Sequence, residues 1–454
     1  MRPLLPLLLL CLLSTGVRAQ LSPAITSFLQ NTTQTGTYYV DGNPTLLPNN
    51  ILVNCQRVEY SDDFVYVTAT GVPAYPTGPF SDRNPSQAED QQAIFRLPLT
   101  PRENTGTPIS TNGGNIGIFI NGVALFDYRD GVAWNPQTND ICGGPGRDAC
   151  PGGARVTQAW NRDAVPAERE GFDCAKGHPA RGNYHHHQNP SAFKLDLNVT
   201  SDICNLYDAE GLYGLDSTAH SPLIGFAYDG FPIYGGYGYR NADGTGGITR
   251  IKSSYALRDI TERTEHADGT DVDDGPPVSA EYFLGYFRED YGYTPPATED
   301  YLDEHNGRFC VTPEYPDGTY AYFATVNADW TSAYPYAVGP TFYGVSENRS
   351  VDAVTEPTTV YEATTGVRSP FGPGEQMTVF PNPAADLIAV QLPGLTTTTF
   401  TVTLHSAKGD VVARKEIAPG QTIAYFNTQT LYRGLYFVRV ANRHGEVTRK
   451  IMVQ

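Results

Sequence analysis

Long apolar runs and positive charge are both scarce in this sequence. The apolar run Leu4 to Leu13 is about half of what a membrane-spanning helix needs, and no later segment is long and apolar enough to cross a membrane. Lys and Arg together number 31 against 49 Asp and Glu, which gives a formal net charge of −18 at pH 7. We therefore expect no transmembrane segment. Neither a nucleic acid nor an anionic membrane surface is an expected partner.

The signatures of several common enzyme classes are also absent. The sequence has no H-E-x-x-H, which disfavours a zincin-type protease, and no G-x-S-x-G nucleophile turn. It has no phosphate-binding P-loop and no dinucleotide fingerprint. There is no C-x-x-C spacing, which disfavours a cysteine-rich zinc site, and no internal repeat of solenoid length is apparent.

The residues that are abundant favour β-structure. The chain has 29 Tyr, 45 Gly and 35 Pro; Tyr favours strands, whereas Gly and Pro break helices. Short strand-like runs such as Phe64 to Val67 and Ile116 to Ile120 alternate with Gly/Pro turns, and helical periodicity is scarce. We predict a mainly β protein, in which an irregular β domain rich in Gly, Pro and Tyr is followed by a small C-terminal β-sandwich.

The N-terminal residues predict export. The positive charge of Arg2, the apolar run and the small-residue site Val17-Arg18-Ala19 have the layout of a secretory signal peptide. A later stretch rich in Thr, Pro, Gly and Ser predicts a linker. The expected division is a signal peptide at 1–19, a β-rich region at 20–345, a linker at 346–375 and a separate C-terminal unit at 376–454.

The cysteines predict disulfide bonds. Of the seven, all but Cys11 follow the predicted signal peptide, and an even number of cysteines in an exported chain is typical of disulfide pairing. Cys142 and Cys150 flank a Gly-Gly-Pro-Gly turn, so this local pair is the first that we expect. The sequence does not choose among pairings of the others, which are Cys55, Cys174, Cys204 and Cys310.

Alternating apolar residues predict several strands in the C-terminal unit. Phe400, Val402 and Leu404 would share one face of a strand, and Tyr436 to Val440 repeats the pattern in another. Several short strands in a segment of this length favour a small β-sandwich.

Three segments of this unit carry a specific resemblance. Val379 to Ala384, Gly434 to Val440 and Lys450 to Gln454 resemble the opening, central and terminal motifs of type IX (Por-type) secretion sorting domains. The resemblance implies passage through the periplasm of a Gram-negative bacterium and export by the type IX secretion machinery. Release or attachment at the outer surface would follow. The alternative is an ordinary sandwich domain that binds carbohydrate or protein.

A group of histidines is the strongest candidate for chemistry. Of nine histidines, five lie between His178 and His220. If the core of this group is a strand, His185 and His187 point one way, roughly 6.5–7 Å apart along it, while Tyr184 and His186 point the other.

Such a pair is able to converge on one ion. His178 is the expected third ligand, and His220 or a carboxylate such as Asp173 the fourth. Imidazole ligands favour zinc or copper, between which the sequence does not choose. A buried polar network of histidines and an exposed loop remain as alternatives.

The region around the histidines resembles the YHYH-domain proteins, named for a Tyr-His-Tyr-His motif. The second Tyr of that motif is His186 here, on the face opposite the expected ligand pair, which leaves the pair intact. The resemblance establishes no activity. It covers about 116–344 and rests on the segments 120–126, 172–190, 220–235, 302–308 and 318–323.

Two function classes follow. In the first, the histidines hold a metal in a hydrolase or oxidase, and Asp173, Asp229 or Glu304 acts as a base or orients an imidazole. In the second, the protein is a non-catalytic surface module and the histidines only brace it. Four protein ligands would favour bracing, whereas three with a water would favour catalysis. The acidic stretch Asp268 to Asp274 does not fit EF-hand spacing, so calcium is not expected.

Overall fold

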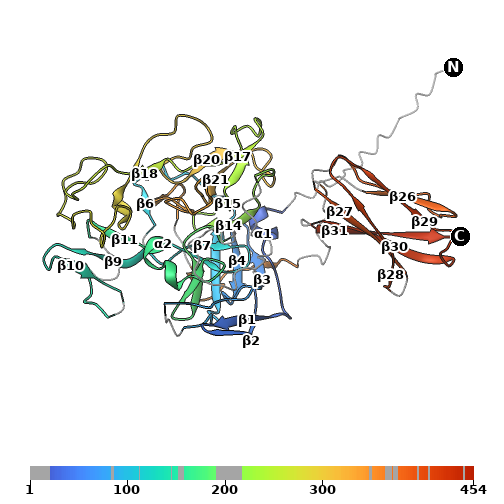
Figure 1. Cartoon of the computed structure of the whole chain (residues 1–454), viewed down its shortest axis with the longest axis horizontal. Coiled ribbons are helices and arrows are strands. Elements are labelled where there is room, and N and C mark those ends of the chain that lie inside the picture. The colour runs from blue at the N-terminus through green and yellow to red at the C-terminus, as the bar shows by residue number, and fades with distance from the viewer. Residues whose placement is uncertain are drawn as a thin grey trace, which may run out of the picture. The chain divides into compact units, whose positions relative to one another are not determined.

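The computed structural model describes most of the chain in two compact units, residues 1–362 and 363–454 (Figure 1). The predicted signal peptide, Cys204 and much of the predicted linker lie outside the described residues. Among the described residues, no helix is long and apolar enough to span a membrane. These residues are 21–82, 86–111, 113–144, 146–151, 158–190, 217–346, 350–362, 371, 377–395, 398–406, 409–442 and 445–454.

Both units are mainly β, as the sequence predicts. The two α-helices of the described residues, α1 (Pro23–Thr26) and α2 (Ala164–Ala167), are four residues long, and η1 (Arg169–Gly171) and η4 (Arg288–Asp290) are single 3-10 turns. The abundant Gly and Pro interrupt the chain too often for longer helices.

An eight-stranded sheet forms the centre of the first unit. Neighbouring strands pair antiparallel except at β13–β8 and β15–β21, which are parallel. On each side of the β7–β14 pair, one parallel pair of strands therefore joins two antiparallel hairpins. The order is β12 (Gly177–Ala180), β13 (Asn183–His186), β8 (Ala124–Phe126), β7 (Asn115–Phe119), β14 (Leu223–Ala227), β15 (Pro232–Tyr234), β21 (Thr319–Phe323) and β20 (Gly307–Cys310).

A second sheet packs with the first around one core. Residues from both sheets, including Val67, Phe95, Ile118 and Phe226, belong to a single buried cluster. Apolar residues on both faces of the central strands are buried there, as expected for a sheet that is covered on both sides. The second sheet has the order β23 (Ser350–Val351), β5 (Ala93–Pro98), β4 (Phe64–Ala69), β3 (Cys55–Tyr60) and β24 (Thr359–Val360).

Short strand pairs complete the unit. A three-stranded sheet has the order β10 (Asp140–Cys142), β9 (Arg129–Asn135) and β11 (Asn161–Asp163). The remaining pairs are β1 (Thr35–Val40) with β2 (Asn43–Leu52), β22 (Thr341–Phe342) with β6 (Ile109–Ser110), β16 (Tyr237–Tyr239) with β17 (Ile248–Arg250), and β18 (Tyr255–Leu257) with β19 (Tyr291–Tyr293).

The predicted disulfide between Cys142 and Cys150 is present, with Cα atoms 4.8 Å apart. Cys174 is also disulfide-bonded. Cys55 and Cys310, however, are buried free thiols. The even number of cysteines therefore predicted disulfide bonding correctly but overstated its extent.

The second unit contains two sheets around a core of its own. The residues predicted to share strand faces are buried, among them Val402, Leu404, Val438 and Val440, which are 0% exposed. One sheet has the order β25 (Thr378–Phe380), β26 (Leu387–Gln391), β29 (Ile423–Asn427). The other has the order β28 (Val411–Ile417), β27 (Phe400–Ser406), β30 (Gly434–Asn442), β31 (Gly445–Val453).

The three motif segments of this unit meet in space. Strand β31 pairs along its length with β30, which carries the central motif. From the opening motif, the side-chain oxygen of Asn382 accepts a hydrogen bond from the backbone N–H of Met452 at 2.9 Å. The backbone N–H of Ala384 donates to the carbonyl of Met452 at 2.8 Å. The motifs therefore hold the two sheets together at one end.

Candidate metal site

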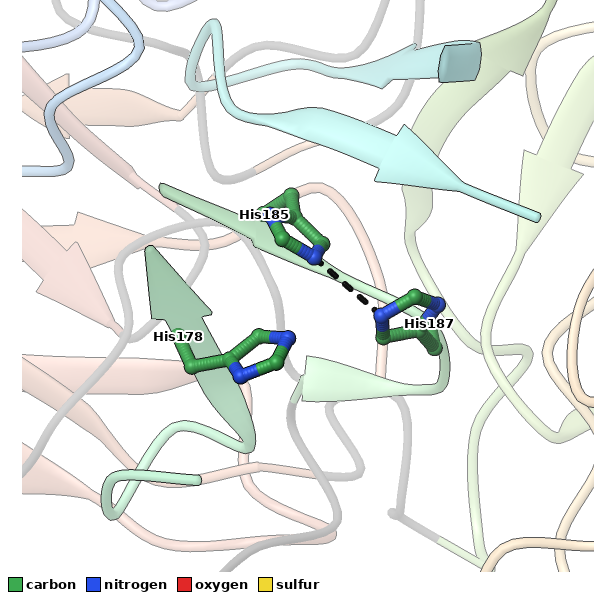
Figure 2. A group of neighbouring side chains, drawn as sticks. All are labelled: His178, His185 and His187. Atoms are coloured by element: carbon green, nitrogen blue, oxygen red, sulfur yellow. Dashed lines mark hydrogen bonds between the residues drawn. The ribbon is translucent and has the colours of Figure 1, made fainter. Parts of the chain in front are cut away.

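The hairpin of β12 and β13 brings three histidines together at the edge of the eight-stranded sheet. His178 on β12 is paired directly with His185 on β13, and His187 follows the end of β13. The three rings turn toward a common point (Figure 2), and one ligand nitrogen from each lies within 4.8 Å of the others. The predicted alternation is confirmed, because Nε2 of His185 and Nε2 of His187 are 3.1 Å apart.

Backbone carbonyls set the tautomers of that pair. Nδ1 of His185 lies 2.8 Å from the carbonyl of Asn183, and Nδ1 of His187 lies 2.7 Å from the carbonyl of Asp127. Because a carbonyl only accepts hydrogen bonds, each Nδ1 carries the proton and each neutral ring presents a lone pair at Nε2. Two lone pairs that face each other at 3.1 Å repel, unless a proton or a cation lies between them.

Glu168 completes this group, and sequence analysis did not identify it. It follows the one-turn helix α2, whose first turn is capped by the buried side chain of Asp163. Its Oε2 lies 3.2 Å from Nε2 of His178 and 3.3 Å from Nε2 of His187. No motif surrounds Glu168, so only the fold reveals its place.

The contacts of Glu168 with the histidines are short, but their geometry is not that of a hydrogen bond. Among the described residues, neither Oε2 of Glu168 nor Nε2 of His178 makes an acceptable hydrogen bond. The side chain of Glu168 is 25% exposed, compared with 10% for His178 and 2% for His187. The group is thus buried and reaches solvent mainly through Glu168.

The electrostatics of the group favour a neutral His185 beside an ionised Glu168 carboxylate. Burial, together with the neighbouring histidines, lowers the pKa of His185 well below its ordinary value. Burial also works against the charged form of His187, but the Glu168 carboxylate outweighs it and raises the pKa of His187. Burial opposes ionisation of Glu168 too, yet its two histidine neighbours hold its pKa well below the usual range. This set of donors is suited to a cation.

Aromatic rings support the three histidines. Phe126 stacks on His185 with ring centroids 3.7 Å apart, and Phe172 meets His178 edge-on at 4.9 Å. These contacts restrict rotation of the imidazoles and shield them from water. The histidines are therefore held in place by packing as well as by hydrogen bonds.

The opposite face of β13 lies in the core. Nε2 of His186 lies 2.7 Å from the hydroxyl of Tyr75, and burial lowers the pKa of His186 to about 3. Tyr184 is also buried and donates its hydroxyl hydrogen bond to Asp173. The histidine that replaces the second Tyr of the name motif thus joins a polar core contact and not the ligand group.

The structure does not bring His220 to the group, although the sequence placed it among the expected ligands. Its ring packs against Tyr234 at 5.1 Å and Tyr239 at 5.0 Å, and its Nδ1 lies 2.8 Å from the carbonyl of Ser221. Burial lowers the pKa of His220 to about 4. Nearness in sequence was misleading, because the strands next to His220 belong to the other half of the sheet.

Asp173, predicted as a ligand or base, is fully buried in a turn before β12. Its carboxylate accepts hydrogen bonds from the backbone N–H groups of Gly78, Ala175 and Gly177 and from the hydroxyl of Tyr184. Burial raises its pKa to about 7, against the effect of these donors. Both oxygens are engaged by the fold itself.

Asp229 and Glu304, the other two candidate bases, are also not part of the histidine group. Asp229 is buried at the β14–β15 turn, where it accepts hydrogen bonds from the hydroxyl of Tyr322 at 2.6 Å and the N–H of Gly344 at 2.8 Å. Burial raises its pKa to about 6. The side chain of Glu304 is 57% exposed and lies 3.9 Å from Nε2 of His305.

Comparisons with known proteins agree with both sequence resemblances. A search of curated proteins finds no match to the chain. Residues 378–454 match the secretion system C-terminal sorting domain, which implies type IX export to the outer surface or the medium. Residues 94–335 match the family model described as YHYH protein, which covers more than half of the sequence. The chain belongs to the YHYH protein family.

Proposed function

We propose that this protein is an exported metal-binding protein in which His178, His185, His187 and Glu168 hold one transition-metal ion, zinc or copper. The observation that carries the proposal is the 3.1 Å approach of two Nε2 atoms whose rings both direct Nδ1 at a carbonyl. A cation between them turns this repulsion into attraction. Imidazole and carboxylate ligands suit both metals.

The spacing of the donors fits a single ion. Four ligands about 2.0 Å from a tetrahedral ion lie about 3.3 Å from one another. The three short separations in this group are 3.1 Å, 3.2 Å and 3.3 Å. Four protein ligands would close the coordination shell, which supports a metal that braces the hairpin.

One observation favours a second, catalytic function. Glu168 is the most exposed of the four donors, with 25% of its side chain accessible. If a water molecule replaces Glu168 as a ligand, the metal keeps three histidine ligands and one position open to water, as in hydrolytic zinc sites. Glu168 would then be the general base for that water, in place of Asp173, Asp229 or Glu304. A bound copper ion would instead supply the redox chemistry of an oxidase.

Metal content tests the proposed site. We would purify the exported chain without a histidine tag, measure metals by elemental mass spectrometry, and compare the His185→Ala/His187→Ala variant. The expected result is about one equivalent of zinc or copper per chain in the wild type and none in the variant. Absence of both metals from the wild type, even after incubation with each ion, would overturn the proposal.

The Glu168→Gln variant distinguishes a structural metal site from a catalytic one. If Glu168 is a ligand, this variant binds the metal more weakly, since an amide oxygen is a poorer donor than a carboxylate. If Glu168 is a base, the variant keeps its metal and loses hydrolysis of ester or glycoside substrates that the wild type cleaves. A variant that retains both full affinity and full activity would exclude Glu168 from either role.

A further inference from the structure

The eight-stranded sheet consists of two halves that repeat one unit. Residues 116–126 read I-G-I-F-I-N-G-V-A-L-F and residues 224–234 read I-G-F-A-Y-D-G-F-P-I-Y, so the β7–β8 and β14–β15 hairpins align without a gap. The side chain of Asn121 accepts the N–H two residues on at 3.2 Å, and that of Asp229 does the same at 3.3 Å. Asp229 is thus the counterpart of a turn asparagine.

The halves join symmetrically through β7 and β14. Gly225 pairs with Phe119 and Ala227 pairs with Gly117, on either side of the Phe226–Ile118 pair. A Cβ on Gly117 would lie 2.6 Å from the carbonyl oxygen of Phe226, and a Cβ on Gly225 would lie 2.6 Å from that of Ile118. The same close approach therefore occurs twice, once from each half.

The outer hairpin of the first half begins with a turn that Asp173 organises. Its backbone N–H donates to the carbonyl of Gly177 at 2.9 Å. Its Oδ1 accepts the N–H groups of Ala175 at 2.9 Å and Gly177 at 3.1 Å, and its Oδ2 accepts the hydroxyl of Tyr184 at 2.8 Å. One carboxylate thus joins the turn, the start of β12 and the facing strand β13.

Asp303 organises the same turn in the second half. Its backbone N–H donates to the carbonyl of Gly307 at 2.9 Å. Its Oδ1 accepts the N–H groups of His305 at 2.9 Å and Gly307 at 3.1 Å and the hydroxyl of Tyr320 at 2.9 Å. Strands β20 and β21 are therefore fastened by the same set of contacts as β12 and β13.

Both turns require a glycine under the tyrosine. A Cβ on Gly177 would lie 2.3 Å from the hydroxyl of Tyr184, and a Cβ on Gly307 would lie 2.3 Å from that of Tyr320. Each tyrosine crosses directly over the glycine to reach its aspartate. This crossing holds the two strands of each hairpin in their register.

The two halves differ in the residues that the hairpins present. The register places Arg308 and Ala321 where the first half has His178 and His185, and Phe323 stands where it has His187. The Arg308 guanidinium donates to backbone carbonyls, including that of Arg240, and lies 5.5 Å from the centre of the Phe323 ring. The second half keeps the turn and has no ligand group at these positions.

From this comparison we propose that Asp173 is a positioning residue for the metal ligands. Through Tyr184 it fastens β12 to β13 in the register that sets His178 opposite His185. Its bond to the N–H of Gly78 at 3.0 Å ties the turn to a distant part of the chain. This inference rests on the proposed metal site and assigns Asp173 neither to the metal nor to proton transfer.

The duplicated turn supplies a matched control. Asp173→Asn and Asp303→Asn each replace a carboxylate oxygen with an amide that faces hydrogen-bond donors, so both variants lose stability. Only Asp173→Asn disturbs the hairpin that carries the histidines. Tyr184→Phe and Tyr320→Phe form a milder pair of variants, each of which removes one hydroxyl from its turn. This pair replaces the aspartate variants in the test if those do not fold.

The test is metal binding by the full-length variants, with cobalt(II) as a spectroscopic probe and zinc in competition. We expect the Kd of Asp173→Asn to rise by about tenfold or more, as for residues that orient ligands, and its cobalt absorption spectrum to change. Asp303→Asn should keep the wild-type Kd and spectrum. Unfolding measured on both variants reports the loss of stability separately.

Two results would overturn the inference: wild-type affinity and spectrum in Asp173→Asn, or an equal loss of affinity in Asp303→Asn. Either would mean that the turn contributes only to stability. Failure of the proposed function looks different, because the wild type itself would then bind none of zinc, copper and cobalt. In that case the positioning role of Asp173 would be excluded together with the metal site.

Discussion

Oε2 of Glu168 lies 3.2 Å from Nε2 of His178, at an angle that makes no acceptable hydrogen bond. An ionised carboxylate and a neutral imidazole in a buried site would ordinarily turn to share a proton. Here the fold also holds Oε2 of Glu168 3.3 Å from Nε2 of His187, which in turn lies 3.1 Å from Nε2 of His185. The arrangement satisfies all four donors at once if they surround a cation.

His187→Ala and His220→Ala should differ sharply in metal content. The first removes a donor from the convergent group, whereas the second removes a ring that packs among Tyr234 and Tyr239. We expect His187→Ala to lose the metal and His220→Ala to keep about one equivalent, measured by elemental mass spectrometry on chains purified identically. Loss of metal in His220→Ala, with its fold intact by circular dichroism, would return His220 to the ligand set.

Gly177→Ala should be strongly destabilising. The added Cβ would lie 2.3 Å from the hydroxyl and 2.4 Å from Cζ of Tyr184, both in a buried and rigid ring. Overpacking of this kind costs about 1–3 kcal/mol or more of unfolding free energy. Denaturant unfolding of the variant measures the loss.

Gly292→Ala is the matched control for that substitution. A Cβ at Gly292, also in a strand of the first unit, would meet only ordinary contacts at 3.4 Å and 3.5 Å. Its unfolding free energy should stay within about 0.5 kcal/mol of wild type. Equal behaviour of the two variants would contradict the close crossing of Tyr184 over Gly177.

Asp229 should make the unfolding free energy depend on pH. Burial raises its pKa from the ordinary value of 3.8 to about 6 in the folded protein. A group whose folded pKa is raised stabilises the fold fully below its unfolded pKa, and this contribution is lost as pH rises through the folded pKa. The loss between about pH 4 and pH 6 amounts to about 3 kcal/mol for a fully buried group.

Asp229→Asn isolates this contribution, since the amide does not titrate. The counterpart turn in the other half already carries Asn121, which indicates that the turn accepts an asparagine. We expect chemical denaturation from pH 4 to pH 7 to show a smaller decline in stability for Asp229→Asn than for wild type. Parallel curves for the two proteins would show that Asp229 ionises normally in the fold.

Removal of residues 378–454 should block export to the surface or the medium. These residues match the sorting domain and form a unit with its own buried core. Cell fractionation followed by immunoblotting should find the truncated chain retained within the cell envelope, while the full chain reaches the outside. Equal amounts of both chains outside the cell would exclude the sorting role of this unit.

Local periodicity was enough to predict the strand-level features. Alternation placed His185 of β13 and His187, just after this strand, on the same side of the chain, and placed Val402 and Val438 on strand faces that lie in the core of the second unit. Alternation succeeds because successive side chains of a strand point to opposite faces, whatever surrounds the strand. The local disulfide between Cys142 and Cys150 was predictable for a similar reason, since a short turn brings its two ends together.

The full set of residues in the ligand group could not be predicted from local periodicity, because these residues come from separate segments of the chain. His220 was expected because it is close in sequence, but it lies among Tyr234 and Tyr239. Glu168 was overlooked because its contact with the histidines depends on how α2 packs beside the hairpin. The internal repeat also escaped notice, because its two copies are far apart and share few identical residues outside the turns.

The sequence by itself determined the mainly β fold class, the C-terminal sorting domain and the pair His185 and His187, because each of these depends on composition or on neighbours along the chain. The tertiary structure alone decided that Glu168 and not His220 joins the histidines, and that Asp173, Asp229 and Glu304 lie in other surroundings. Convergence of side chains from separate segments depends on the register and packing of distant strands, which no local pattern records.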